Sequence, residues 1–431
     1  MRKGLLHKPI VVFGPVIDKV IFTHVVVIGL PTIIYYCILK SGWNLLPLHL
    51  LIPILYFVTS VVVIGESMST AIAYSSPRVQ KPKLGILQRF LRPRTYATQR
   101  NEVSEPNRPL PKCSLIVVAY LPNEQHIIVS TLKYILNHVD RPEAGLEVIL
   151  AYNSPMRLPV EDELERLAER YPELRLLLVE ESRSKAENLN AALKIVTGEV
   201  TGILDADHRP NADCFRRAWS WLASNRYAVV QGRNVIRNSR NNFLTRMIAV
   251  EFECMYGVSH PAKSLLADTG MFCGSNGYWR TAVLRRIRFS PTMMTEDIDA
   301  TLRTLLNGYR ILHDRSIIAT ELAPIDFSSF WFQRKRWAQG WLEVSFKYQR
   351  RVWKSKHLNL KQKFYWTYLL YYCVVYSLLA LQILPLILSL FLFHGYLPPS
   401  DNAYLWFCTM ITFFSGIYQT VVTMRVSYIR Y

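Results

Sequence analysis

The chain has 431 residues, half of them hydrophobic, and carries a formal net charge of +19. Only 19% of its residues are charged, which excludes a disordered chain and disfavours an ordinary soluble enzyme, because so many apolar side chains need an apolar environment. The positive charge favours anionic partners, either nucleic acid, lipid headgroups or phosphorylated substrates. The seven cysteines are scattered and include no Cys-x-x-Cys pair, so neither a disulfide framework nor a zinc site is expected.

Four apolar segments predict membrane spans near the two ends of the chain. Residues 20–39, 45–64, 364–393 and 402–424 contain no Asp, Glu, Lys or Arg, and about 20 apolar residues suffice to cross a bilayer. The third segment begins with many aromatic residues, as at a membrane interface, so its crossing is predicted at 375–393. Because Lys and Arg lie outside these two hairpins and hardly within their short loops, both termini and the central region are predicted to be cytoplasmic.

A basic segment, residues 77–112, follows the first hairpin. Arg89, Arg92 and Arg94 lie among leucines and a phenylalanine. This pattern fits a short amphipathic helix on an anionic leaflet and a solvated linker equally well.

The central region alternates strand-like and helix-like runs. Strands are predicted at 114–119, 147–151, 174–179 and 200–204, and helices at 127–138, 161–170 and 185–195. The strand candidates are apolar and rich in branched side chains, as in buried parallel strands. This order predicts an α/β domain with a mostly parallel sheet.

Two carboxylates follow the last of these strands, in the run from Asp205 to His208. In an open α/β sheet, ligands bind beyond the carboxyl ends of the strands. Asp205 and Asp207 there can hold a hard divalent cation that neutralises a diphosphate. Taken alone, however, two aspartates separated by one residue are more often a solvated acidic turn.

A second acidic run extends from Thr295 to Asp299. Thr295 can cap a helix whose dipole favours the acids of its first turn, which accounts for Glu296. The alternative makes Asp297 a general base that takes a proton from an attacking hydroxyl. Alone, this run does not decide between the two.

A third run, from Gln333 to Trp341, combines arginines with tryptophans. A planar guanidinium suits a diphosphate, and an indole face suits a sugar ring. The same residues suit an interfacial amphipathic helix, and both interpretations can hold together.

Taken in order, these runs resemble membrane-integrated family 2 glycosyltransferases, such as cellulose, hyaluronan, chitin and poly-N-acetylglucosamine synthases. The resemblance covers about residues 111–341 and includes Lys185 with its following helix, and the run from Phe272 to Ser275. It implies a GT-A-type catalytic domain, a nucleotide-diphosphate sugar as donor, and an inverting transfer that uses Mg²⁺ or Mn²⁺.

The resemblance also implies roles for individual residues on the donor side. Asp205 would contact the donor nucleotide, Asp207 would ligate the metal, and Lys185 would lie near the donor phosphates. Gln333 and Arg336 would hold the diphosphate.

On the acceptor side, Asp297 would be the catalytic base, with Glu296 beside it in the substrate site. Trp337 would lie beneath the acceptor sugar. The residues expected to line the acceptor site are Phe272, Cys273, Gly274 and Ser275.

The sequence departs from the family pattern in the expected nucleotide site. Tyr120 and Glu124 belong to a stretched form of the usual Tyr-Asn-Glu run. The second strand ends in Tyr152 and Asn153, where the family usually has an acidic turn. Tyr152 is predicted to stack on a uracil and Asn153 to pair with its edge.

The resulting architecture is a cytoplasmic GT-A domain inserted between two transmembrane hairpins of a multi-pass protein, in a bacterial inner membrane or a eukaryotic plasma or Golgi membrane. The predicted parts are residues 1–76 with two spans, the linker 77–112, the catalytic domain 113–330, an interfacial amphipathic segment 331–363, and 364–431 with two spans. So few spans make a thin channel wall unless a second copy or an accessory subunit completes it.

The predicted function is transfer of glucose or N-acetylglucosamine from a UDP-sugar to a growing polysaccharide. The alternative is a non-processive enzyme with a lipid acceptor, similar to ceramide glucosyltransferases. The expected partners are therefore a nucleotide sugar, a glycan or lipid acceptor and membrane lipids. Nucleic acid is not expected, because no motif for binding it appears.

Overall fold

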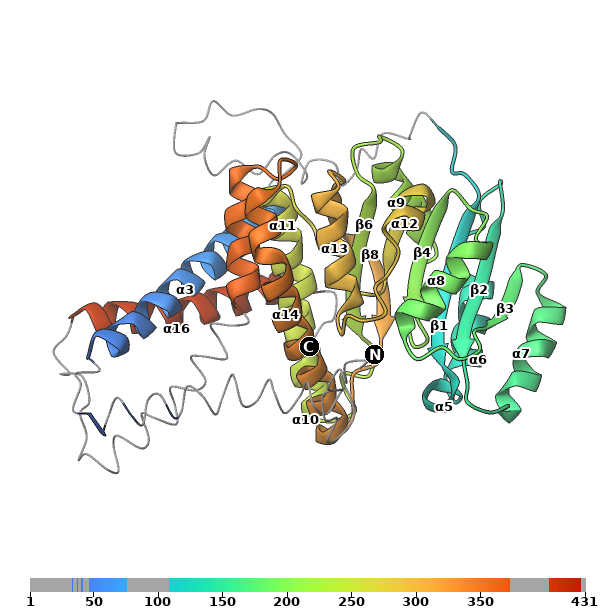
Figure 1. The fold of residues 1–431 in the computed structure, drawn as a ribbon, viewed down its shortest axis with the longest axis horizontal. Coiled ribbons are helices and arrows are strands. Elements are labelled where there is room, and N and C mark those ends of the chain that lie inside the picture. The colour runs from blue at the N-terminus through green and yellow to red at the C-terminus, as the bar shows by residue number, and fades with distance from the viewer. Residues whose placement is uncertain are drawn as a thin grey trace, which may run out of the picture. The chain divides into compact units, whose positions relative to one another are not determined.

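The computed structural model describes residues 46–75, 108–372 and 403–427, together with residues 33, 37, 40 and 41 (Figure 1). The chain divides into two compact units. The first comprises residues 1–59 and 369–412, and the second comprises residues 60–368 and 413–431.

An eight-stranded sheet forms the centre of the second unit, in the order β3-β2-β1-β4-β7-β6-β8-β5 (Figure 1). The strands β3, β2, β1 and β4 are parallel, as are β6 and β8, whereas β7 and β5 run antiparallel to their neighbours. Four of the seven strand pairings are parallel, so the sheet is mostly parallel, as predicted, with two antiparallel strands that make it mixed. Its strands are β1 (Cys113–Tyr120), β2 (Leu146–Asn153), β3 (Leu174–Leu178), β4 (Val200–Asp205), β5 (Arg209–Pro210), β6 (Val229–Ile236), β7 (Gly277–Arg280) and β8 (Ile311–Glu321).

The four strands and three helices predicted for the first half are confirmed to within three residues. Their apolar side chains explain the folding: Leu132 and Ile135 of α6 and Leu164 of α7 are fully buried in one core with β1 and β2. Both faces of β1, β2 and β4 are covered, which is why these three strands read as continuous apolar runs. The helices of this half are α5 (Leu121–Glu124), α6 (Ile128–His138), α7 (Pro159–Arg170), α8 (Lys185–Ile195) and α9 (Cys214–Leu222).

The register of the sheet brings polar residues together at the carboxyl ends of three strands. Tyr120 at the end of β1 pairs with Asn153 at the end of β2. Asp205 at the end of β4 pairs with Val118 of β1. The residues that follow these strands therefore share one edge of the sheet, as expected for an α/β domain.

The second half of the domain adds further helices, some of which close this edge. They are α10 (Phe243–Phe252), the π-helix η3 (Glu253–Ser259), α11 (His260–Ala267), α12 (Thr281–Ile287), α13 (Glu296–Leu306) and α14 (Phe327–Lys354). The predicted interfacial segment 331–363 contains most of α14, which begins at Phe327 and ends at Lys354, and the start of a further helical stretch over 360–372.

Helix α3 (Leu46–Ser75) contains Ile54–Ala73, within the described residues the one helical stretch long and apolar enough to cross a membrane. This stretch overlaps the predicted span 45–64 over residues 54–64 and extends to Ala73. Helix α16 (Ala403–Val426) covers residues 403–424 of the predicted span 402–424. Two predicted spans lie outside the described residues: 375–393 entirely, and 20–39 except for residues 33 and 37. The two hairpins therefore remain predictions.

Within the second unit, the C-terminal part of α3 packs on the sheet domain. Thr70 Oγ1 donates a hydrogen bond of 3.1 Å to the carbonyl oxygen of Val258 in η3. Ala71 packs against a small core formed by Val258, Val422 and Val426. Helix α3 is therefore attached to the same π-helix that reaches the cavity described next.

Candidate functional site

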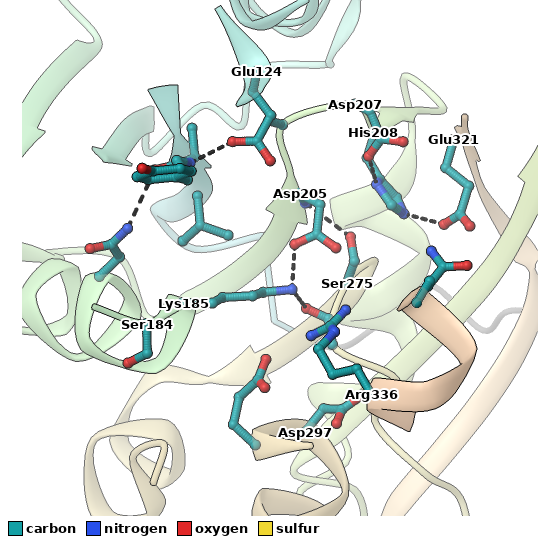
Figure 2. A pocket seen from close by; sticks show the side chains of 18 of the residues that line it. Glu124, Ser184, Lys185, Asp205, Asp207, His208, Ser275, Asp297, Glu321 and Arg336 are labelled. Atoms are coloured by element: carbon teal, nitrogen blue, oxygen red, sulfur yellow. Dashed lines mark hydrogen bonds and ion pairs between the residues drawn. The ribbon is translucent and has the colours of Figure 1, made fainter. Parts of the chain in front are cut away.

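A cavity of about 960 Å³ opens at the carboxyl ends of β1, β2 and β4 (Figure 2). Its other walls come from the start of α8, the loop before β7, the start of α13 and one face of α14. The predicted residues that line it are Tyr120, Glu124, Asn153, Lys185, Asp205, Asp207, Cys273, Gly274, Ser275, Glu296, Asp297, Gln333, Arg336 and Trp337. Residues from all five motifs that carry the family resemblance thus meet in one place.

Two predicted site residues, Tyr152 and Phe272, do not line this cavity. Tyr152 is 6% exposed, belongs to the core under the sheet, and its hydroxyl lies 3.2 Å from Oε2 of Glu161. Successive side chains of a strand point to opposite faces, so Tyr152 points away from the face that Asn153 occupies. Phe272 is fully buried and contacts the ring of Trp279 edge-on. The predicted stacking of Tyr152 on a base is therefore wrong.

Lys185, the first residue of α8, joins the two sides of the cavity (Figure 2). Its ammonium forms an ion pair with Asp205 and donates a 2.9 Å hydrogen bond to the carbonyl oxygen of Gly274. Burial opposes its charge, but Asp205, Glu296 and Asp297 outweigh burial and raise the pKa of Lys185. The cavity therefore holds a fixed positive charge between carboxylates.

Asp297 lies in the first turn of α13, where its Oδ1 accepts a 2.8 Å hydrogen bond from the backbone N–H of Ile298. Burial, followed by the negative charge of Glu296, raises the pKa of Asp297 to about 7. Gly274 lies against it: its φ is +84°, and a Cβ there would be 3.2 Å from Oδ2 of Asp297. A carboxyl group that titrates near neutral pH is suited to general base catalysis.

Asp207 is held by residues that the sequence analysis did not single out. Its Oδ1 lies 2.8 Å from Nδ1 of His208, and its Oδ2 accepts a 2.8 Å hydrogen bond from the backbone N–H of Leu322. Nε2 of His208 lies 2.6 Å from Oε2 of Glu321. Burial works against both charges, yet His208 lowers the pKa of Asp207 to about 2, while Asp207 and Glu321 raise that of His208 to about 10.

Glu124 and Asn153 form the wall at the ends of β1 and β2. Burial raises the pKa of Glu124 to about 7, against the hydrogen bond that its carboxylate accepts from the backbone N–H of Tyr120. Asn153 donates a 2.9 Å hydrogen bond to the carbonyl oxygen of Ser182 and accepts one of 2.8 Å from Asn188. Asn188 also lines the cavity, and only its position inside α8 could have indicated it.

Helix α14 presents two arginines in different ways. Arg336 points into the cavity toward Lys185 (Figure 2). Arg334 instead makes hydrogen bonds of 2.7 and 2.6 Å to the two carboxylate oxygens of Glu251, and its guanidinium lies 4.5 Å from the ring centroid of Trp337. Arg334 therefore fixes α14 on α10, whereas Arg336 is available to a ligand.

Comparison with known proteins agrees with this arrangement. The family described as "Glycosyl transferase family group 2" matches residues 201–418, half of the chain. The chain is 24% identical to the probable glycosyltransferase YdaM of Bacillus subtilis over 74% of its own length and 75% of that protein. It is 25% identical to the poly-beta-1,6-N-acetyl-D-glucosamine synthase of Staphylococcus epidermidis over 72% of each chain.

A third relative, the beta-monoglucosyldiacylglycerol synthase of Synechocystis sp., is 27% identical over 58% of this chain, which spans about half (53%) of that protein's length. Among solved structures, the mannosyltransferase PcManGT of Pyrobaculum calidifontis, in complex with GDP-Man and Mn²⁺, superposes with a TM-score of 0.56. That comparison has 20% identity and covers 87% of this chain and 98% of the other. The fold is therefore a mixed α/β fold of the GT-A type, and the chain is a glycosyltransferase that belongs to family group 2.

Proposed function

We propose that the chain transfers a sugar, with inversion, from a nucleotide-diphosphate sugar to a hydroxyl group of an acceptor at the membrane. The observation that carries this proposal is the position of Asp297. It is a carboxyl group with a pKa of about 7, in a cavity whose other residues include Asp205, Asp207, Lys185 and Arg336. This pairs a base with groups suited to a diphosphate.

The proposed reaction is a single displacement. Asp297 takes the proton of the acceptor hydroxyl while the oxygen of that hydroxyl attacks the anomeric carbon of the donor. The bond from that carbon to the diphosphate breaks, and the nucleoside diphosphate leaves with the electron pair. Lys185 and Arg336 supply positive charge where the leaving group gains negative charge, so no covalent enzyme intermediate is required.

The residues of the cavity fit Mg²⁺ or Mn²⁺. Asp205 and Asp207 both line it, and hard cations prefer carboxylate oxygens. Within the described residues, no group of three or more acidic, His or Cys side chains forms a complete metal cage. Mg²⁺ is usually held by one or two carboxylates together with the phosphates of the substrate. When bound, such a cation neutralises the diphosphate; in our proposal, Asp207 ligates it and Asp205 contacts the nucleotide.

The proposed donor is UDP-glucose or UDP-N-acetylglucosamine. The similarity to a poly-N-acetylglucosamine synthase supports this choice. Without the stacking of Tyr152, the base would be recognised by polar groups at the end of β2, where the Asn153 amide is held by Ser182 and Asn188. GDP-sugars should be tested beside UDP-sugars, because the fold is similar to that of a mannosyltransferase solved with GDP-Man.

The proposed acceptor is a growing polysaccharide, and the family resemblance assigns Trp337, Cys273 and Ser275, which line the cavity, to its site. The second candidate is a lipid acceptor, which the similarity to a beta-monoglucosyldiacylglycerol synthase supports. An exposed apolar surface at the start of α14 and α10 also favours it. This surface consists of Phe243, Met247, Phe327, Trp331 and Phe332, each at least 52% exposed.

The same surface, together with α3 and its 20-residue apolar stretch, supports placing the enzyme at a membrane. The Lys and Arg residues outside the predicted hairpins support a catalytic domain on the cytoplasmic side. The amphipathic start of α14 would lie in the headgroup region, as the sequence predicts for the segment that begins at 331. A second copy or an accessory subunit would complete any channel for a polysaccharide.

Sizing the product tests the acceptor. Membranes that contain the chain would receive a radiolabelled UDP-sugar, and the lipid extract and the insoluble polymer would be counted separately. A ladder of lengths in the polymer fraction is expected. A product of one fixed mass in the lipid extract would replace the polysaccharide by the lipid acceptor, and label in neither fraction would contradict both.

A further inference from the structure

Asp207 and Glu321 are bridged by a buried imidazole, although they lie far apart in the sequence (Figure 2). Asp207 follows β4, Glu321 ends β8, and His208 lies between them with 3% of its surface exposed. Both ring nitrogens of His208 have carboxylate partners, at 2.8 and 2.6 Å. The imidazole therefore has no lone pair to offer to a metal ion in this arrangement.

The far end of this bridge is itself fixed. Asn234 of β6 donates a 2.8 Å hydrogen bond to Oε2 of Glu321, the same oxygen that contacts His208. Asn234 of β6 pairs with Ala319 of β8, two residues before Glu321. The orientation of the bridge is therefore set by the pairing of two strands and not by a loop.

The backbone beside Asp207 is held from the same direction. The backbone N–H of Leu322 donates to Oδ2 of Asp207, 2.8 Å away. Arg237 donates to the carbonyl oxygen of Asp207 and, over 2.9 Å, to that of Thr320. Leu322, directly after β8, thus holds the side chain of Asp207, and Arg237, directly after β6, holds its main chain.

We propose that Glu321, acting through His208, is a positioning residue that holds the Asp207 carboxylate in the orientation needed to ligate the divalent cation. This inference rests on the proposed function, in which Asp207 is the protein ligand of that cation. Carboxylate partners behind a metal site fix the orientation of its ligands, and their loss costs about 10–100-fold in metal affinity. Here the ligand is the aspartate, and the histidine and glutamate stand behind it.

The test is the affinity of the full chain for Mn²⁺, measured by calorimetry in detergent micelles with saturating UDP, and in parallel with GDP. Glu321→Ala is expected to weaken Mn²⁺ binding by about 10–100-fold. Glu321→Gln keeps an oxygen that accepts from His208, so a clearly smaller loss is expected. The affinity for each nucleotide without metal should be the same in both variants as in the wild type.

Two variants calibrate the measurement. Asp207→Asn should abolish Mn²⁺ binding, and Glu173→Gln, which removes a carboxylate paired with Arg141 at the far side of the sheet, should change nothing. If Glu321→Ala binds Mn²⁺ as tightly as the wild type does while Asp207→Asn does not, the positioning role is wrong. If Glu321→Ala loses metal-free nucleotide binding to the same extent, its role is merely structural and the inference fails. If the wild type binds no Mn²⁺ with either nucleotide, the metal-dependent function itself is wrong, and the inference falls with it.

Discussion

Gly340 of α14 lies directly against Thr295, the residue that precedes α13: a Cβ on Gly340 would lie 2.3 Å from Cγ2 of Thr295. This contact joins the helix that carries Gln333 and Arg336 to the helix that begins beside Asp297. A base on one helix and a diphosphate site on another must keep a fixed distance for an in-line transfer, because misplacement by 1 Å can cost about 100-fold in rate. The contact sets that distance.

Replacing Gly340 with alanine should therefore separate the two helices. We expect Gly340→Ala to lower kcat and to destabilise the protein by about 1–3 kcal/mol, the usual cost of overpacking. The measurements are the initial rate of nucleotide release and the thermal unfolding midpoint. Gly416→Ala in α16 is the control, because a Cβ at Gly416 meets nothing within 4 Å. Equal rates and midpoints for Gly340→Ala and the wild type would show that the contact is not needed.

The pKa of Asp297 predicts how the rate depends on pH. The base must be ionised, so kcat/KM should rise with pH through about 7. Because the charge of Glu296 contributes to raising this pKa, Glu296→Gln should move the midpoint of the rise to lower pH. The pKa of Glu124 is also about 7, so Glu124→Gln is the control. If Asp297 is the base, the rise should persist in this variant. A rise that disappears in Glu124→Gln would assign it to that residue instead.

The same pKa shift predicts a cost in stability. A carboxyl group whose pKa is raised on folding destabilises the fold above its folded pKa, about 7, and has no such effect below its unfolded pKa, about 4. At pH 8, Asp297→Asn should therefore have a free energy of unfolding higher than that of the wild type by on the order of a few kcal/mol, and it should unfold at a higher temperature. This difference should vanish toward pH 4. Calorimetric scans at the two pH values measure this. An Asp297→Asn variant less stable at pH 8 would contradict the shift.

Substitutions of two arginines of α14, Arg334 and Arg336, should have different effects, one on stability and the other on substrate binding. Arg336→Gln should raise the KM for the nucleotide sugar with little change in the unfolding midpoint, because Arg336 is exposed to the cavity. Arg334→Gln breaks the paired hydrogen bonds to Glu251 and the contact with Trp337, so it should cost about 1 kcal/mol of stability. Steady-state kinetics and thermal unfolding of both variants test this. The opposite pattern would exchange the two roles.

Glu66 of α3 should matter for the attachment of that helix. It is 4% exposed, lies 3.5 Å from the ammonium of the buried Lys263, and accepts hydrogen bonds from Ser259 and Tyr365. Removing one partner of a buried ion pair costs about 3–5 kcal/mol, so Glu66→Leu should strongly destabilise the fold. Glu66→Leu combined with Lys263→Met should recover much of that loss. Additive effects in the thermal unfolding of the single and double variants would show that the two residues do not interact.

The parallel part of the sheet and most of the cavity could be predicted from the sequence, because buried strands have a strong apolar signal. Once β1, β2 and β4 are known to be parallel, the residues after them must share one edge. Asp205 followed from that rule, whereas Tyr120 and Asn153 were named through the resemblance to the family. Tyr152 did not, because β2 is buried on both faces and its sequence does not indicate which side chains face the core.

The role of Glu321 could not be predicted, because it depends on contacts that only the fold creates. Glu321 is a single acid at the end of a strand, with no motif around it. The position of the apolar stretch in α3 was missed for a related reason. Glu66 ends the uncharged run in the sequence, but in the structure its charge is buried against Lys263, so the apolar helix continues past it.

The most direct test of the account is nucleotide release by the purified full chain and by Asp297→Asn, across UDP- and GDP-sugars with Mn²⁺. The account predicts that at least one sugar supports release. It further predicts that the variant binds that donor normally but turns over about 10²–10⁴-fold more slowly, the range that general base catalysis provides. Equal rates for the two proteins would contradict Asp297 as the base, and with it the mechanism proposed for this cavity.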